Sequence, residues 1–488
     1  MYFRMGFLML ISLYSSRVIL QQLGVDDYGI YNLVGSIVMM FSALKEMFAN
    51  STSRFMAFEL GQKNEEKLNL IYNLSTYING MISIIFLVLV EIIGLWFLEY
   101  KINVAPDRLF AAHMVFQFSV ISTIATIMTT PFNAMIIAHE RMDFYAYLSI
   151  FEGLARLGVC FLLPLFGFDK LIFFGFLYLC IAIIILLINR IFCSKNFKEC
   201  KFKLVWDKEY FRKMMSFAGW TFFGNCSYTL AQNGINMIFN VFGGPIVNAA
   251  RGVSYQVNNA VNQFVNSIAV VTTPFSVKSY ASKEYDRFFS LFFITSKLYF
   301  LIELLFTVIL AFNAKEILHL WLGQIPEYTI EFVILVLLQS VFRSLCNPLG
   351  ILFFSVGKIK QQQISEGIIL ALPIILSYAL LHFGYPFYTA FLSMIGCEII
   401  RILVLSLFAK KVCNLNLKNY AVKVLFPCTI CLIAFGISYK AMFDNPSHLG
   451  LQVLATVGTC VMLVLLMILF GVSKDERIII KNLIKHKQ

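Results

Sequence analysis

Residues 171–188 read LIFFGFLYLCIAIIILLI. None of these eighteen side chains is charged. A helix needs about 20 mainly apolar residues to cross the hydrocarbon core of a bilayer. Such a helix also satisfies its own backbone hydrogen bonds where no water is present. This stretch therefore predicts a membrane-spanning helix.

Composition extends this reading to the whole chain of 488 residues, which is 59% apolar and 14% charged. Soluble domains are about 45–50% apolar and about 25% charged. We predict an all-α polytopic membrane protein without a sizeable soluble domain. Fourteen candidate spans recur along the sequence: 3–23, 28–49, 70–98, 109–137, 145–166, 171–193, 216–241, 247–273, 288–312, 328–355, 364–383, 387–409, 423–443 and 450–471.

The net charge of +12 follows the predicted topology and not a nucleic-acid surface. With both termini in the cytoplasm, cytoplasmic segments hold 27 of the 39 Lys and Arg residues, and the opposite side holds six. Cytoplasmic loops of membrane proteins are enriched in Lys and Arg. We therefore predict a multi-pass protein of the bacterial cytoplasmic (inner) membrane, with an even number of spans and no nucleic-acid partner.

An internal repeat organises the spans. When the chain is shifted by 217 residues, Pro131 aligns with Pro348 and Gly167 with Gly384. We predict two six-span lobes of parallel topology, followed by two extra spans. The predicted segments are 1–193 (spans one to six), the basic linker 194–215, 216–410 (spans seven to twelve), and 411–488 (two spans and a basic tail). Repeated lobes are typical of transporters that bind substrate between them.

Two neighbouring spans carry polar stripes. Residues 248–266 read NAARGVSYQVNNAVNQFVN, with five Asn and with Arg251 near the start. The preceding span adds Asn225, Thr229, Gln232, Asn233, Asn236 and Asn240 at helical spacing. An unsatisfied amide in hydrocarbon costs several kcal/mol. The stripes must face protein or water, so they either bond across helices or line a water-filled cavity.

Several charges lie inside the predicted spans. Glu152 precedes Arg156 by one turn, and Glu398 precedes Arg401 by three residues, so we expect both pairs to form ion pairs. Arg17, Arg54, Arg251 and Arg343 have no such neighbour and are predicted to be unpaired. Arginines bind phosphate oxygens, and amides bind hydroxyls, so a diphosphate carrying sugars suits both. The predicted substrate-binding residues are Arg17, Arg54, Arg251, Arg343, Asn225, Gln232, Asn233, Asn236, Asn258 and Asn262.

No motif for an energy-supplying reaction is present. GxxxxGK[ST] and HExxH are both absent. We expect no catalytic residue, no metal and no cofactor, and a transport process driven by H⁺, Na⁺ or the membrane potential. Candidate ion-coupling carboxylates are Glu46, Glu91 and Glu303. The eleven cysteines fall mostly in apolar spans, where packing explains them.

Three motifs carry a family resemblance: SSRVILQQLGVDDYGIYNLVGSIVMMFSAL at 15–44, SRF at 53–55, and ILHLWLG at 317–323 with Pro326 following. The chain resembles the Wzx-type polysaccharide and O-antigen flippases. They belong to a superfamily, often abbreviated MOP, that includes the MATE exporters and the MurJ lipid II flippases. The resemblance implies a V-shaped pair of lobes and alternating access. It also implies that cavity arginines occupy spans one, two and eight, which Arg17, Arg54 and Arg251 fit by position.

The function implied is translocation of an undecaprenyl-diphosphate-linked oligosaccharide from the cytoplasmic to the periplasmic leaflet. It would serve the synthesis of lipopolysaccharide O-antigen, capsule or exopolysaccharide. We expect a monomer that contacts membrane lipids and can also contact the polysaccharide polymerase or export machinery. A MATE-like ion-coupled exporter of small molecules is the alternative. A membrane enzyme is disfavoured because the outer loops are short.

Overall fold

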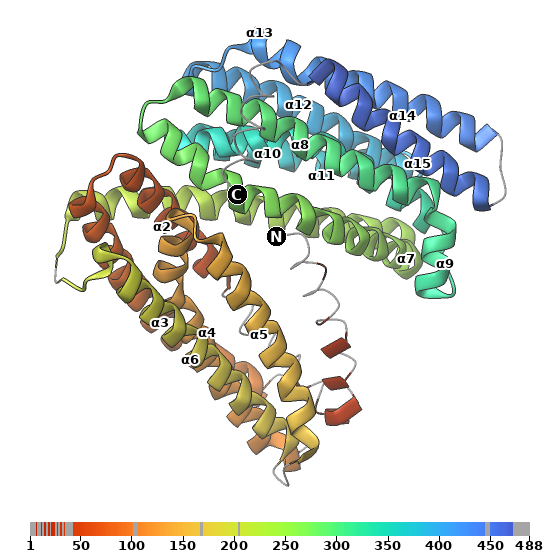
Figure 1. Ribbon diagram of the computed structural model, residues 1–488. Helices are drawn as coiled ribbons and strands as arrows, with labels where there is room; N and C mark the ends of the chain where they lie inside the picture. Colours follow the sequence, from red (N-terminus) through yellow and green to blue (C-terminus); the bar gives the residue numbers. More distant parts are fainter. Residues whose placement is uncertain are drawn as a thin grey trace. The chain divides into compact units, whose positions relative to one another are not determined.

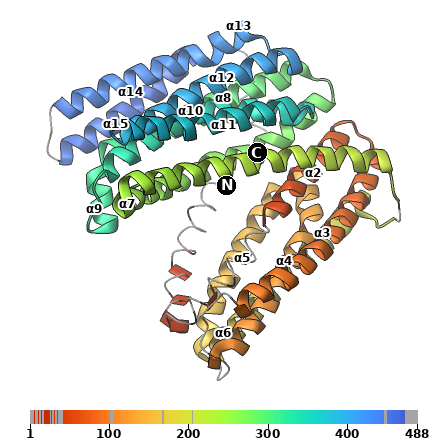
Figure 2. The same cartoon turned by 180° about the vertical axis from the view of Figure 1, so that it is seen from behind.

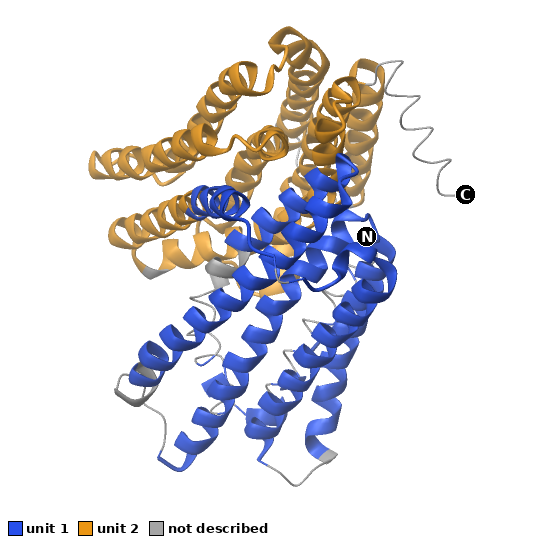
Figure 3. Ribbon diagram, turned by 90° about the vertical axis from the view of Figure 1, so that its left-hand side faces the viewer, with its two compact units in different colours: residues 1–222 blue, residues 223–488 orange. Residues whose placement is uncertain are grey.

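The structure, a computed structural model, describes residues 42–100, 106–165, 169–203, 205–444 and 449–471, with scattered residues before 42. These residues form helices and turns, and none of them lies in a strand. The all-α class predicted from composition is confirmed. The chain divides into two compact units, residues 1–222 and 223–488, coloured separately in Figure 3. The segment boundaries predicted from sequence stay a prediction.

Unit 1 is a helical bundle with α4 at its centre (Figure 2). Helix α4 packs against α2, α3, α5 and α6, and α2 also packs against α3. The helices of this unit are α2 (Ser42–Gly61), α3 (Glu65–Tyr100), α4 (Leu109–Ala138), α5 (Met142–Leu162) and α6 (Lys170–Asn196).

Unit 2 has α10 in the corresponding central place, packed against α8 and α12 (Figure 1). Helix α11 packs on α12, while α14 and α15 pack on each other and on α8. The helices are α7 (Lys208–Ala281, whose first residues belong to unit 1), α8 (Tyr285–Phe312), α9 (Ala314–Leu322), α10 (Thr329–Val356), α11 (Lys360–His382), α12 (Tyr388–Cys413), α13 (Leu417–Tyr420), α14 (Phe426–Asp444) and α15 (Leu449–Leu466).

Ten helices of the described part are long and apolar enough to cross a membrane, as judged by length and composition. They coincide with ten of the predicted spans, from 70–98 onward. The predicted spans 216–241 and 247–273 both fall in α7, whose polar stripes make it too polar to meet the same criterion. The predicted span 3–23 and most of 28–49 lie outside the described residues. The chain is a multi-pass membrane protein.

Matching turns support the internal repeat. Lys63, Glu140 and Lys283 each follow a helix in the left-handed conformation, with φ of 57°, 61° and 62°. Each donates its N–H to the carbonyl three residues earlier, and the next residue donates its N–H to the carbonyl five residues before it, which is the Schellman closure of a helix. Gly357, 217 residues after Glu140, is also left-handed, with φ 84°.

The two prolines singled out by the repeat occupy equivalent places. Pro131 lies inside α4 and Pro348 inside α10, the central helix of each unit. Both helices are more than half buried over their most apolar window. The two prolines that the repeat aligns therefore occupy equivalent positions in the central helices of the two units, so the alignment is not a coincidence of apolar composition.

Gly244 turns α7 back on itself. Its φ of 65° and ψ of −164° are not helical, and a side chain would make this backbone conformation costly. In a straight helix, residues fifteen apart would be about 22 Å apart at 1.5 Å per residue. Instead the Arg251 side chain donates to Asn236 Oδ1 at 2.8 Å. The two polar stripes of the sequence therefore face each other across a helical hairpin.

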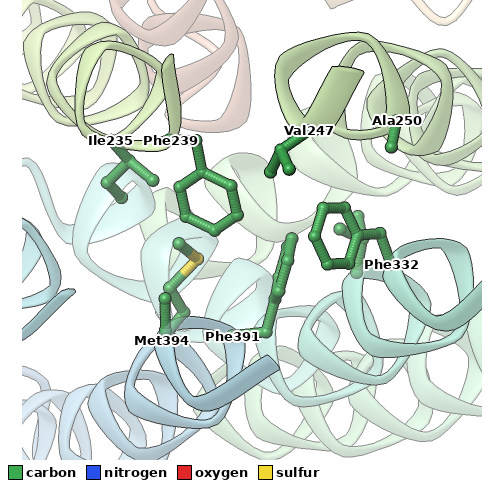
Figure 4. Packing of buried hydrophobic residues seen from close by; sticks show 9 residues of the cluster. Ile235, Phe239, Val247, Ala250, Phe332, Phe391 and Met394 are labelled. Carbon is green, nitrogen blue, oxygen red and sulfur yellow. The ribbon is translucent and has the colours of Figure 1, made fainter. Parts of the chain in front are cut away.

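An aromatic cluster holds this hairpin against α10 and α12 (Figure 4). The Phe239 ring lies 5.8 Å from that of Phe332 and 5.3 Å from that of Phe391. Val247 and Ala250 of the second arm join the same cluster. The apolar face of the hairpin is thus buried, which fixes the position of the adjacent Arg251.

Asp169 joins the N-terminal ends of two unit 1 helices, α4 and α6. Its Oδ1 accepts the backbone N–H groups of Leu171 and Ile172 at 3.0 and 3.1 Å, which caps α6. Its Oδ2 binds Arg108 at 2.5 Å, just before α4 begins. Burial by itself raises the pKa of Asp169, but these backbone and guanidinium hydrogen bonds lower it below its usual value.

The basic linker is fastened to α3 by amide side chains one turn apart. The Asn69 Nδ2 donates to the carbonyl of Lys201 at 2.8 Å. Asn73 both donates to that carbonyl, at 3.1 Å, and accepts the N–H of Lys203 at 2.9 Å. The Tyr77 hydroxyl donates to the Lys203 carbonyl at 3.1 Å. An extended segment is therefore ordered without a strand partner.

We expect Asn73→Ala to destabilise this attachment. Asn73 is fully buried, so the change leaves the Lys203 N–H without its partner, at a cost of about 1–3 kcal/mol. Thermal unfolding of the purified protein and protease cleavage within 197–207 measure the effect. Asn196→Ala is the control, because the exposed Asn196 amide bonds only to Phe192 in its own helix. Equal melting and cleavage of the two variants would contradict the role of Asn73.

Candidate functional site

Arg251 is buried in unit 2 and is held by amides. It is 5% exposed. Its Nη1 donates to Asn236 Oδ1 at 2.8 Å, and its Nη2 donates to Gln232 Oε1 at 3.2 Å. None of the ion pairs among the described residues includes Arg251. Neutral oxygens therefore solvate this guanidinium and leave its positive charge uncompensated.

Two aromatic rings cover the same guanidinium. Its Cζ lies 4.3 Å from the centroid of Tyr255 and 5.7 Å from that of Phe239. The Arg251 Nε and the Tyr255 hydroxyl are buried, and neither has a hydrogen-bond partner in the part of the chain that the structure describes. Unsatisfied buried polar groups are uncommon and often mark a place where water or a ligand binds.

Beside Arg251, four buried side chains form a row of alternating charges. Arg343 Nε donates to Glu398 Oε1 at 3.0 Å. The other oxygen of Glu398 accepts from Arg401 Nη1 at 3.2 Å, and Arg401 Nη2 binds Glu366 at 2.6 Å. The row joins α10, α12 and α11, and each of its side chains is at most 12% exposed.

The expectation that Arg343 lacks a carboxylate partner is wrong. Glu398 lies on another helix, 55 residues away in sequence, so a search within one helical turn does not find it. The predicted pairs Arg401–Glu398 and Arg156–Glu152 are confirmed, at 3.2 and 2.7 Å.

Arg343 also connects the charge row to the polar stripes. Its Nη1 donates to the hydroxyl of Tyr228 at 3.0 Å, and Tyr228 is 40% exposed. A cavity of about 20 Å³ is lined by Gln232, Gln339 and Arg343 among others. A cavity of this size admits a water molecule. Because Gln232 also binds Arg251, the two arginines share one polar neighbourhood.

Other predicted amides have structural partners. Asn258 is 3% exposed, and its Oδ1 accepts from Ser340 of α10 at 2.5 Å. Asn262 Nδ2 donates to the Asn258 carbonyl at 3.0 Å. The Asn258 side chain therefore forms a hydrogen bond between helices, and the Asn262 side chain forms one within its own helix. Asn225 is half-buried and Asn233 is exposed, and neither is among the partners of Arg251.

In unit 1, Arg54 is buried among aromatic rings. It is 7% exposed, and its Cζ lies 4.7 Å from the Phe55 centroid and 4.9 Å from that of Phe58. The predicted site residue Arg17 lies outside the described residues. Of the two unit 1 arginines predicted to bind substrate, the structure therefore describes Arg54.

The three candidate coupling carboxylates differ in their surroundings. Glu91 accepts a hydrogen bond from Gln117 at 3.1 Å. Glu303 is 1% exposed, and its Oε1 is buried without a hydrogen-bond partner among the described residues. The side chain of Glu46 is outside the described part. Within that part, no group of three or more His, Cys, Asp or Glu side chains is placed to bind a metal ion.

Sequence reasoning missed Tyr228, Glu366 and Gln339. Tyr228 lies one turn before Gln232 on the polar stripe, so helical periodicity could have found it. Glu366 gives no such signal, because its partner Arg401 is 35 residues away and meets it only through the packing of α11 on α12.

Comparison with known families places the arrangement in context. Residues 3–280 match the family model described as polysaccharide biosynthesis protein. No curated protein matches the chain.

Solved structures share the fold at low sequence identity. A MATE transporter in a bent conformation has a TM-score of 0.74 at 13% identity, covering 84% of this chain and 92% of its own. A MOP superfamily transporter from Pyrococcus furiosus gives 0.68 at 13%, covering 84% and 93%. An outward-facing multidrug resistance MATE transporter gives 0.71 at 12%, covering 84% and 93%. This likeness confirms the MATE-like fold.

We expect Glu398→Gln to destabilise unit 2 strongly. The change leaves Arg343 and Arg401 with one carboxylate, Glu366, and breaking a buried ion pair costs about 3–5 kcal/mol. Glu284→Gln is the matched control, because the Glu284–Arg287 pair is about half exposed and such pairs contribute about 1 kcal/mol or less. Thermal unfolding in detergent compares the two variants. A melting temperature of Glu398→Gln as high as that of the control would contradict the structural role of the charge row.

Proposed function

Because this chain belongs to the polysaccharide biosynthesis protein family, we propose that it is a flippase for undecaprenyl-diphosphate-linked oligosaccharide. It carries this lipid from the cytoplasmic to the periplasmic leaflet of a bacterial cytoplasmic membrane by alternating access. The glycan serves a surface polysaccharide such as O-antigen, capsule or exopolysaccharide. Both termini lie in the cytoplasm, and the chain acts as a transporter without catalytic residues.

The observation that carries the proposal is the buried Arg251 guanidinium, which is bonded to amides and, within the described residues, to no carboxylate. A charge inside a membrane costs at least about 2.5–3.5 kcal/mol, so it is expected to serve a function. Amide oxygens stabilise the cation without neutralising it. An anionic group that reaches this site gains the full attraction of the guanidinium.

Arg343 supplies a second cation in the same neighbourhood. Glu398 also accepts a hydrogen bond from Arg401, which is itself bonded to Glu366. If Arg343 turns from Glu398 toward an anion, Glu398 therefore keeps Arg401 as a hydrogen-bond partner. The present cavity admits water only, so a diphosphate requires the cavity to widen.

The sugars of the cargo match the remaining polar groups. Amides such as Gln232 and Gln339 donate and accept hydrogen bonds, as hydroxyl recognition requires. The polyprenyl chain stays in lipid. Arg54 and Arg17 of unit 1 are proposed as further diphosphate contacts during the transport cycle.

A MATE-like exporter of cationic small molecules is the second candidate, favoured by the fold likeness and by the Glu398 carboxylate in the cavity wall. Cation exporters need an uncompensated negative charge. Glu366 and Glu398 are instead both bonded to arginines. A drug-susceptibility panel on a deletion strain separates the candidates, since the exporter predicts sensitisation and the flippase predicts loss of surface glycan.

We expect Arg251→Gln to reduce transport about 10- to 100-fold, because hydrogen bonds to charged groups contribute about 1.5–3 kcal/mol. The measurements are surface glycan, and lipid-linked oligosaccharide accumulating on the cytoplasmic face. Arg251→Lys should restore part of the activity, since Lys keeps the charge but not the planar fork. Gln263→Ala, at an exposed position on the same helix, is the control. Normal surface glycan in Arg251→Gln cells with normal protein levels would refute the role of Arg251.

A further inference from the structure

The linker between α6 and α7 presents four lysine side chains without an acidic partner. Lys195, Lys198, Lys201 and Lys203 are all exposed, and none of them takes part in an ion pair within the described ranges. The one acidic residue among them, Glu199, is half-buried. This part of unit 1 therefore carries several positive charges that the described side chains do not compensate.

The start of α3 lies beside the linker but does not neutralise it. Asn69 of α3 binds the linker backbone. One turn earlier, Glu65 and Glu66 are exposed, and the exposed Lys63 and Lys67 flank them. The acidic and basic side chains at this helix start are equal in number, so the charge of the linker lysines remains.

Two aromatic side chains lie among and after these lysines. Phe202 is 66% exposed and Trp206 is 57% exposed. Phe202 contacts the Tyr77 ring edge to face at 5.9 Å, and Trp206 contacts the Phe211 ring at 4.9 Å. Large aromatic side chains beside lysines are typical of the region where a membrane meets water. The four lysines, Phe202 and Trp206 are together called the linker surface.

The length of α3 gives the depth of this surface. The candidate span Glu65–Trp96 has 32 residues, or about 48 Å at 1.5 Å per residue, whereas the hydrocarbon core is about 30 Å thick. The apolar run 80–98 is about as long as the core requires. Tyr77 and Asn73 precede this run by about 5 and 11 Å along the helix. The headgroup layer is about 5–8 Å thick, so Tyr77 lies within it and Asn73 just outside it.

The backbone of the linker is fixed at this depth. Asn73 accepts the N–H of Lys203 at 2.9 Å, and the Tyr77 hydroxyl donates to the Lys203 carbonyl at 3.1 Å. Asn73 also donates to the carbonyl of Lys201. These contacts use main-chain groups only, so both ammonium groups remain available. Because the main chain is already ordered, a ligand that binds the two lysines loses less conformational entropy.

We propose that the linker surface binds the headgroups of anionic phospholipids. The lipid phosphate oxygens accept hydrogen bonds from the ammonium groups of Lys201 and Lys203, and Phe202 and Trp206 lie beside the glycerol groups. A membrane that contains anionic lipid has a negative surface potential, which attracts basic side chains within a Debye length of about 10 Å at 0.1 M salt. This inference does not depend on the cargo of the proposed function.

The aromatic side chains favour a lipid over an acidic segment of another protein. An acidic segment would neutralise the lysines equally well, but a charged chain would not cover two large rings at the depth of the headgroups. The lipid interface accommodates both kinds of side chain, since phosphates attract the lysines and the partly apolar glycerol region surrounds the rings.

Quenching of Trp206 fluorescence by brominated lipids tests the proposal. The chain has four Trp residues, so Trp96, Trp220 and Trp321 are replaced by Phe in the full chain, which is reconstituted in vesicles of phosphatidylcholine and phosphatidylglycerol. Bromination of one lipid or the other gives their relative affinity at Trp206. We expect a preference of about tenfold for phosphatidylglycerol at low salt, falling below about twofold at about 1 M salt, where the Debye length is about 3 Å.

Two pairs of exposed lysines give a matched comparison. Lys201→Gln combined with Lys203→Gln should reduce the low-salt preference to about twofold or less. Lys410→Gln combined with Lys411→Gln removes the same charge at the end of α12, where the neighbouring aromatic Phe408 is half-buried, and should keep the preference.

An unchanged preference in the Lys201→Gln/Lys203→Gln variant would overturn the proposal. Absence of quenching by either lipid would also overturn it, because Trp206 would then lie outside the bilayer and an acidic protein partner would fit better. If the single-Trp chain does not fold, melting temperatures in detergent decide. Phosphatidylglycerol should raise that of the wild type more than phosphatidylcholine does, and Lys201→Gln/Lys203→Gln should remove the difference. Equal effects of the two lipids on the wild type would refute the site.

Discussion

The absence of water in the hydrocarbon core of a membrane is the constraint on which this structure depends. Every polar group placed there must find a partner within the protein. The described chain meets this demand with helices, whose backbones satisfy themselves, and with a few polar clusters on α7, α10, α11 and α12. Positions where the demand is not fully met, such as Arg251 Nε and Glu303 Oε1, are therefore informative about function.

The two kinds of buried arginine in unit 2 illustrate the difference between structure and function. Arg401 is bonded to two carboxylates on α11 and α12, and it holds these helices together. Arg251 is bonded to amides, which fix its position but leave its charge available. Arg343 is intermediate, because it shares Glu398 with Arg401 and touches a partly exposed tyrosine. A site for an anion needs the second kind, positioned by the first.

Much of the fold could be predicted because its determinants are local. A run of apolar residues specifies a spanning helix whatever surrounds it, and ten such runs were found where the helices lie. The offset of 217 residues located Pro131 and Pro348 in the two central helices, since a repeat preserves the turn and the proline together. The polar stripes located Arg251, Gln232 and Asn236. The pairing of Arg343 was predicted wrongly, and Glu366 was missed, because both depend on partners from distant helices.

The sequence by itself determined the membrane class, the positions of ten spans, the repeat and the residues of the polar hairpin, because each is encoded by composition or period along one segment. Only the tertiary structure decided which buried charges are neutralised. That decision depends on distances between side chains on different helices, such as the 3.0 Å between Arg343 and Glu398. Coulombic attraction acts through space and not along the chain, so no local pattern contains it.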